Sequence, residues 1–66
     1  MNLSAKSVER LLKVLEEYRL VAYTSSIDAK RRGLRADFRF HEGRASAFSE
    51  AKHAVREVLE SGDEAN

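Results

Sequence analysis

The residues whose types could act together chemically are the cations between positions 28 and 44. This stretch carries six Lys and Arg residues against three Asp and Glu residues, whereas residues 45–66 carry two against five. Clustered cations neutralise the phosphates of nucleic acids, and arginine also hydrogen-bonds to guanine edges. The stretch therefore predicts a nucleic-acid contact made by Lys30, Arg31, Arg32, Arg35, Arg39 and Arg44.

The same cations fit a second interpretation, in which they only solvate the outer side of a strand. Asp37 lies between Arg35 and Arg39 and neutralises part of the charge. No aromatic residue is expected on that outer side, so base stacking has no platform there. Phosphate contact is the predicted role, and only Arg35 and Arg39 are candidates for contacting base edges.

The residue types give little support to enzymatic or metal chemistry. The chain has no cysteine, no glycine-rich phosphate loop and no pair of histidines at the spacing of a zinc helix. Glu50 and His53 have the spacing of half a di-iron site, but no second half exists. His41 has no partner that the sequence places beside it. We expect a protein that is not an enzyme and has no catalytic residue, metal or cofactor.

The length of the chain limits the size of any core. We assign residues 1–61 to a single domain and residues 62–66 to an acidic, frayed tail. A hydrophobic content of 42% indicates a folded chain. Domains this short bury little surface, and without cysteine the chain cannot add a disulfide, so we expect a homodimer.

Several absences favour the cytoplasm. A chain without cysteine suits a reducing compartment. The N-terminal residues lack the pattern of a signal peptide. The longest apolar run, LVAY at 20–23, is too short for a membrane span, so no membrane contact is expected.

Two segments have the apolar spacing of amphipathic helices. The first runs from 4 to about 19, with Ser4 as its N-cap and an end near Arg19, which would enter the apolar stripe. The second runs from 46 to about 61, with Ser46 as its cap and Gly62 at its end. The apolar faces are formed by Val8, Leu11, Leu12 and Leu15 in the first helix and by Phe48, Ala51, Val55, Val58 and Leu59 in the second.

The segments between these helices are predicted to be strands. Residues 34–41 alternate strictly between apolar and polar types, and Gly33 and Gly43 flank them as turn residues. Residues 20–27 alternate less regularly and contain β-branched side chains, which favours a strand slightly. The other interpretation is a short helix over 25–32 that stops at Gly33.

The fold class that follows is α+β, in the order α-β-β-α. A two-stranded antiparallel hairpin packs on two helices, and an open edge of this sheet pairs with a second chain. The segment Ser49–Ala54, with Leu59, is similar to the final helix of double-stranded-RNA-binding domains, and small sheet-type DNA-binding arms of phage integrases end in a comparable way. The resemblance covers one helix, and both families have a three-stranded sheet.

The predicted function is that of a small regulatory protein that binds DNA or RNA phosphates through a basic strand and connection. The alternative is an accessory protein of the phage or plasmid type that inhibits or modulates a protein partner, as antitoxins do. An open strand edge and the acidic surface of the second helix are the features that favour this alternative.

Overall fold

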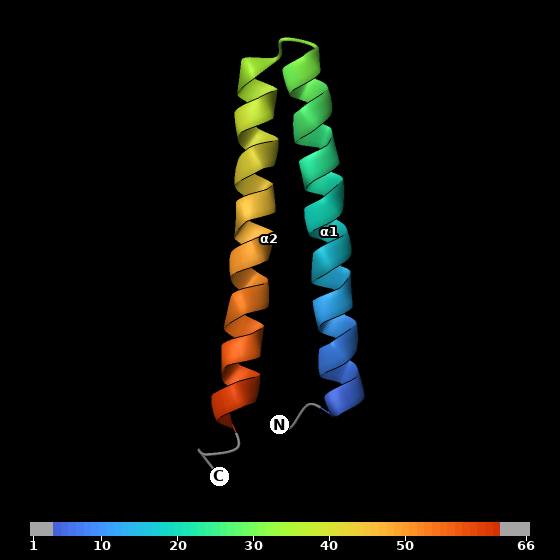
Figure 1. The fold of residues 1–66 in the computed structure, drawn as a ribbon, viewed down its shortest axis with the longest axis vertical. Coiled ribbons are helices and arrows are strands. Elements are labelled where there is room, and N and C mark those ends of the chain that lie inside the picture. The colour runs from blue at the N-terminus through green and yellow to red at the C-terminus, as the bar shows by residue number, and fades with distance from the viewer. Residues whose placement is uncertain (1–3, 63–66) are drawn as a thin grey trace.

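The chain folds as a hairpin of two long helices that run side by side in opposite directions (Figure 1). In the computed structural model, which describes residues 4–62, helix α1 spans Ala5–Arg31 and helix α2 spans Arg35–Gly62. No residue between 4 and 62 lies in a strand. The predicted α+β class, with its two-stranded sheet and its dimer through a sheet edge, is therefore wrong. The three-stranded families that the second helix resembles have no counterpart in this fold.

Helix α1 begins where the sequence predicts and continues well beyond the predicted end. The Ser4 hydroxyl accepts a hydrogen bond from the backbone N–H of Ser7 at 3.1 Å, as an N-cap should. Arg19 does not end the helix, because its guanidinium pairs with Glu16 one turn earlier. The predicted strand over 20–27 is wrong, since these residues form the central turns of α1.

The connection between the helices is a tight turn centred on Gly33. Gly33 has a φ of 76°, a left-handed conformation that glycine adopts without steric cost. Its N–H donates to the carbonyl of Lys30 at 3.1 Å, and the N–H of Leu34 donates to the carbonyl of Ala29 at 2.9 Å. These two bonds form a Schellman motif, which satisfies the last carbonyls of α1. The interpretation of Gly33 as the residue that stops a helix is confirmed.

Helix α2 replaces the strand predicted over 34–41 and absorbs the second helix predicted over 46–61. Gly43 is no turn residue and Ser46 no cap, since both lie inside α2. The physical reason is that a helix satisfies its own backbone hydrogen bonds, whereas a strand needs a neighbour on each side. Residues 34–44 contain no β-branched side chain and no proline, and Gly43 is the one residue among them that weakens a helix strongly.

The two helices meet along a seam in which residues alternate three and four positions apart, as in a coiled coil. The seam residues are Val8, Leu12, Leu15, Arg19, Ala22, Ser26 and Ala29 on α1 and Phe38, His41, Ala45, Phe48, Lys52 and Val55 on α2. Burial along the seam is thin, because only Val8, Ala22, Ser26 and Ala29 are buried among the described residues. The hydroxyl of Ser26 donates to the carbonyl of Tyr23 at 2.6 Å, which satisfies this buried polar group.

The described residues account for most of the domain assigned to 1–61, and α2 extends to Gly62, the first residue of the predicted tail. The remainder of that tail, residues 63–66, and residues 1–3 of the assigned domain lie outside the described residues. Within the described range, neither helix has a stretch long and apolar enough to cross a membrane.

Candidate functional site

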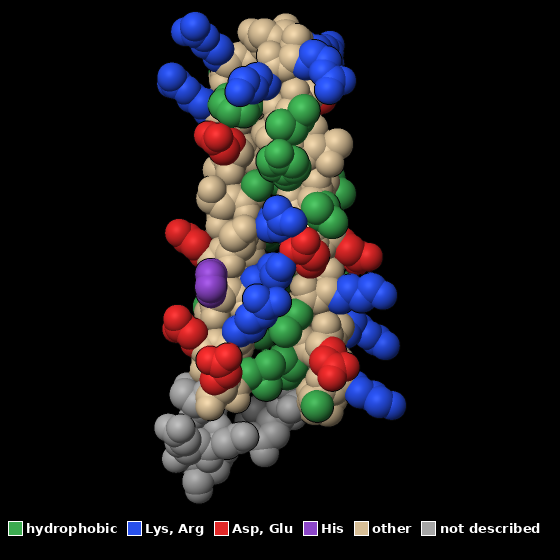
Figure 2. Space-filling view, viewed as in Figure 1, with side chains coloured by type: hydrophobic (Ala, Val, Ile, Leu, Met, Phe, Trp, Pro, Cys, Tyr) green, Lys and Arg blue, Asp and Glu red, His purple; other side chains and the backbone are tan. Residues whose placement is uncertain are grey.

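The turn brings five of the six predicted cations to one end of the hairpin. Lys30 and Arg31 form the last turn of α1, Arg32 follows it, and Arg35 and Arg39 occupy successive turns at the start of α2. All five are exposed, and Figure 2 shows Lys and Arg side chains gathered at the turn end of the molecule. We call these five residues the basic tip. Between residues 28 and 39 the only acidic residues are Asp28 and Asp37.

The basic tip is only weakly neutralised by its own chain. Arg32 Nη1 lies 3.6 Å from Asp28 Oδ2, and both side chains are more than 60% exposed, so this pair is screened by water. The Lys30 ammonium lies 5.7 Å from the centroid of the Phe38 ring. Among residues 4–62, Arg31, Arg35 and Arg39 form no ion pair. Their charge is therefore available to an anion in solution.

Arg44, the sixth predicted cation, does not belong to the tip. It lies five residues beyond Arg39 on α2, where its Nη1 is 3.0 Å from His41 Nδ1 and its guanidinium carbon is 5.8 Å from the Phe40 ring centroid. These contacts hold the side chain against its own helix. The predicted outward strand face for Arg35 and Arg39 and the turn predicted at Arg44 are therefore wrong, since all three residues lie in α2. Arg35 and Arg39 nevertheless share one side of α2 because they stand four residues apart.

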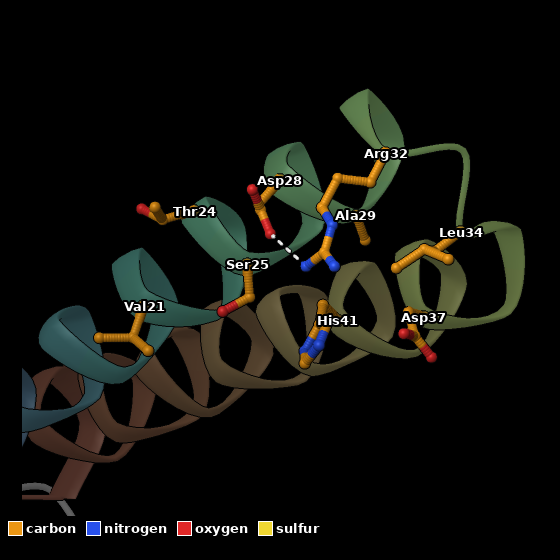
Figure 3. A pocket seen from close by; sticks show the side chains of 9 residues that line it. All are labelled: Val21, Thr24, Ser25, Asp28, Ala29, Arg32, Leu34, Asp37 and His41. Atoms are coloured by element: carbon orange, nitrogen blue, oxygen red, sulfur yellow. Dashed lines mark ion pairs between the residues drawn. The ribbon is translucent and has the colours of Figure 1, made fainter.

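Two shallow open grooves flank the seam near the turn. One is lined by Val21 and Ser25 of α1, by Arg32 of the turn and by Asp37 and His41 of α2, and we call this side of the hairpin the Val21 face. Figure 3 shows Arg32 folding back toward Asp28 over this groove, with Leu34 and Asp37 on the opposite wall.

The second groove opens on the other side of the hairpin. It is lined by Tyr23, Ile27 and Lys30 of α1 and by Phe38 and Glu42 of α2, and we call this side the Tyr23 face.

A cluster of charges that the sequence analysis missed crosses the seam halfway along the hairpin. Glu16 accepts two hydrogen bonds from the guanidinium of Arg19, at 2.9 and 2.7 Å, and a third from the ammonium of Lys52 on α2. Arg19 and Lys52 both occupy seam positions where leucine would be usual. The three-and-four spacing of the seam continues unbroken through Arg19, and this spacing could have revealed the cluster. The sequence analysis instead placed the end of the helix at Arg19.

The cluster fixes the protonation state of its carboxylate. Hydrogen bonds from Arg19 and then from Lys52 lower the pKa of Glu16 from its ordinary value of 4.5 to about 2. The carboxylate in turn raises the pKa of Arg19. All three charges are thus present at neutral pH, and the cluster ties α1 to α2 in one register. Each cation is paired, so the cluster serves the fold and offers no free acid or base.

The remaining polar residues do not converge on a reactive site. Glu50 and His53 are both exposed on α2. Over residues 4–62, no three His, Cys, Asp or Glu side chains are grouped so that they could hold a metal ion. No protein-family model, curated protein or solved structure matches the chain significantly.

Proposed function

We propose that this protein is a non-enzymatic binding protein that contacts nucleic-acid phosphates through its basic tip. The observation that supports this function is the gathering of five exposed cations around one turn, of which only Arg32 has an ionic partner among residues 4–62. The helix ends hold the backbone of these residues rigid, so little backbone conformational entropy is lost on binding.

The proposal gives a definite salt dependence. Five phosphate contacts predict that affinity falls about 500-fold between 50 and 200 mM salt, since each contact releases counterions from the duplex. Contacts made only with phosphates carry no sequence information, so affinity for duplexes of different sequence is expected to be similar.

The test is fluorescence anisotropy with a labelled 20-base-pair DNA or RNA duplex, measured across this range of salt. Changing Arg31, Arg32 and Arg35 together to Gln is expected to abolish most binding at 50 mM salt and to reduce the salt slope by about three. Gln keeps the length of the side chain and the helix propensity, so the fold is expected to persist.

The chain offers a matched control at the opposite end of the hairpin. Lys6, Arg10 and Lys13 are three exposed cations near the start of α1, and their change to Gln alters net charge by the same amount. This control is expected to keep its binding within about threefold, since long-range effects are screened beyond the Debye length. Equal loss in both variants, or no binding by the wild type at 50 mM salt, would contradict the proposal.

A protein partner is the second candidate function, and a different observation favours it. Ten large apolar side chains among the described residues are exposed. Exposed apolar surface of this kind marks a protein contact. The expected homodimer belongs to this part of the proposal.

A further inference from the structure

The hairpin exposes more surface, and is more extended, than a compact single domain of the same mass. It exposes 5521 Å², whereas a compact monomer of 7.5 kDa exposes about 4,200 Å². Its radius of gyration is 15.1 Å, against about 11 Å for a compact domain of this length. The excess of roughly 1,300 Å² per chain exceeds the ~800 Å² that each partner buries in a standard interface.

The exposed apolar side chains are concentrated on the Val21 face. Val21 itself is 59% exposed, and Tyr18 and Leu11 lie one and two heptads before Ser25, which lines the same groove. On α2, Asp37 lines the groove, and Arg44 and Val58 stand one and three heptads after it. Phe40 lies beside Arg44. Residues seven apart on a helix share a side. The Val21 face therefore carries six of the ten exposed apolar side chains, namely Leu11, Tyr18, Val21, Leu34, Phe40 and Val58.

We propose that a second copy of this chain covers the Val21 face, so that α1 of each copy packs on α2 of the other in a four-helix bundle with both turns at the same end. The shapes of the two helices support this arrangement. On this face α1 presents the bulky residues Leu11, Tyr18 and Val21, whereas α2 presents, between Phe40 and Val58, the small residues Ala47, Ala51 and Ala54 at the same levels. The levels are fixed by the ring contact between Tyr18 and Phe48, whose centroids are 5.4 Å apart.

The charges on this face are self-complementary in the same arrangement. Arg32, which follows α1, and Asp37 on α2 both line the groove beside the turn. Arg32 of each copy therefore meets Asp37 of the other when α1 lies over α2 of the second copy. A bundle with the turns at opposite ends would set α1 against α1 and leave these charges without opposite partners.

The dimer places both basic tips at one end of the bundle. Repulsion between the tips is limited, since exposed charges are screened over about 8 Å at physiological salt. If the proposed function holds, a doubled tip offers phosphates twice the number of contacts. The dimer itself rests on the Val21 face alone, so its test is independent of nucleic-acid binding.

The first experiment is sedimentation equilibrium of the full chain at 1–100 μM, with two neighbouring substitutions on α1. Val21→Glu is expected to raise the dissociation constant of the dimer by at least about 100-fold, because it buries a charge in the interface. Leu20→Glu changes an apolar residue that is 46% exposed and stands one heptad before Ile27 of the Tyr23 face, and it is expected to leave the dimer intact.

The second experiment tests which helices meet. Combining Val21→Glu with Ala47→Lys is expected to restore at least tenfold of the lost affinity, because opposite charges then face each other across the dimer. A spin label at Arg31→Cys in each copy is expected to give a distance within about 25 Å, against about 40 Å for turns at opposite ends.

The outcomes decide the proposal. A wild-type chain that sediments only as a 7.5 kDa species at 100 μM overturns it, as does equal weakening by Leu20→Glu and Val21→Glu. A dimer with no rescue by Ala47→Lys and a label distance near 40 Å overturns the arrangement of the helices. If Val21→Glu also loses helical circular dichroism while Leu20→Glu does not, the result supports the dimer, because Val21 is exposed in the single hairpin.

Discussion

The half of the hairpin near the turn and the half near the termini differ in the size and burial of their seam side chains. In the turn half, residues 22–45, the small side chains of Ala22, Ser26 and Ala29 are 0%, 3% and 4% exposed. In the open half, residues 4–21 and 46–62, the seam uses larger side chains such as Leu12, Leu15 and Phe48, yet these are only half-buried.

The difference shows that side-chain size and burial are separate matters in a two-helix structure. Small residues let two helices approach until their backbones cover the contact. Larger residues bury more apolar area only if a further layer covers their outer sides. Since the bulky residues of the Val21 face lie mostly in the open half, we infer that this half needs the second copy more than the turn half does.

The largest effect is expected from overfilling the turn half. Ala22→Leu inserts a branched side chain where Ala22 is completely buried, and it is expected to lower the free energy of unfolding by about 1–3 kcal/mol. The same change at Ala36, which is exposed in the same half, is expected to cost less than about 0.5 kcal/mol. Urea unfolding at one fixed chain concentration measures both. Equal effects at the two positions would show that the turn half is not closely packed.

Changing either of two glycines to alanine is expected to alter the stability of the hairpin, with opposite signs at the two positions. Gly33→Ala is expected to destabilise the hairpin by about 1–2 kcal/mol, because a side chain at a φ of 76° is strained even though nothing lies within 4 Å. Gly43→Ala, inside α2 and equally free of neighbours, is expected to stabilise it by about 0.5–1 kcal/mol. Thermal unfolding of both variants beside the wild type is the measurement. A strand at 34–41 would not produce this pair of signs.

The charged cluster in the middle gives a smaller, pH-dependent effect. Because the folded state lowers the pKa of Glu16 from 4.5 to about 2, the ionised carboxylate stabilises the fold above pH 4.5. This contribution is lost as the pH falls through 4.5 toward 2, where the folded protein must also take up the proton.

Glu16→Gln removes the titrating group and serves as its own control. The wild type is expected to be more stable than this variant at pH 7, and the difference is expected to shrink between pH 4.5 and pH 2. Urea unfolding of both chains across this range tests the expectation. A difference that is constant with pH would show that the cluster does not hold Glu16 ionised in the folded state.

The sequence was sufficient for the parts of the fold that depend on local chemistry. Ser4 caps α1 as expected, the apolar stripes of 4–19 and 46–61 are helical, and Gly33 ends a helix. Each of these features depends on residues within a few positions of one another. The tip cations were also predicted, because Lys30, Arg31 and Arg32 are contiguous and any turn would have exposed them.

The alternation at 34–41 misled because one pattern fits two periods. Leu34, Phe38 and His41 continue the seam spacing of a helix, whereas Ala36 and Phe40 also complete a period of two. The helix prevails because it needs no neighbouring strand, and Phe40 is left 64% exposed as a consequence. Residues 20–27 were misjudged because the seam uses the small residues Ala22 and Ser26, whereas the larger apolar side chains that suggested a strand, Val21, Tyr23 and Ile27, are exposed. The Glu16 cluster could not be predicted, because Lys52 joins it only after the hairpin forms.

The proposed dimer is tested most directly by intermolecular nuclear Overhauser effects in a mixture of isotope-labelled and unlabelled chains. A dimer through the Val21 face gives cross-peaks between the Val21 methyl groups of one copy and the Ala47 methyl group of the other, and none from Ile27 on the Tyr23 face. Intermolecular cross-peaks confined to Ile27 and Leu20, or their complete absence at millimolar concentration, would contradict it.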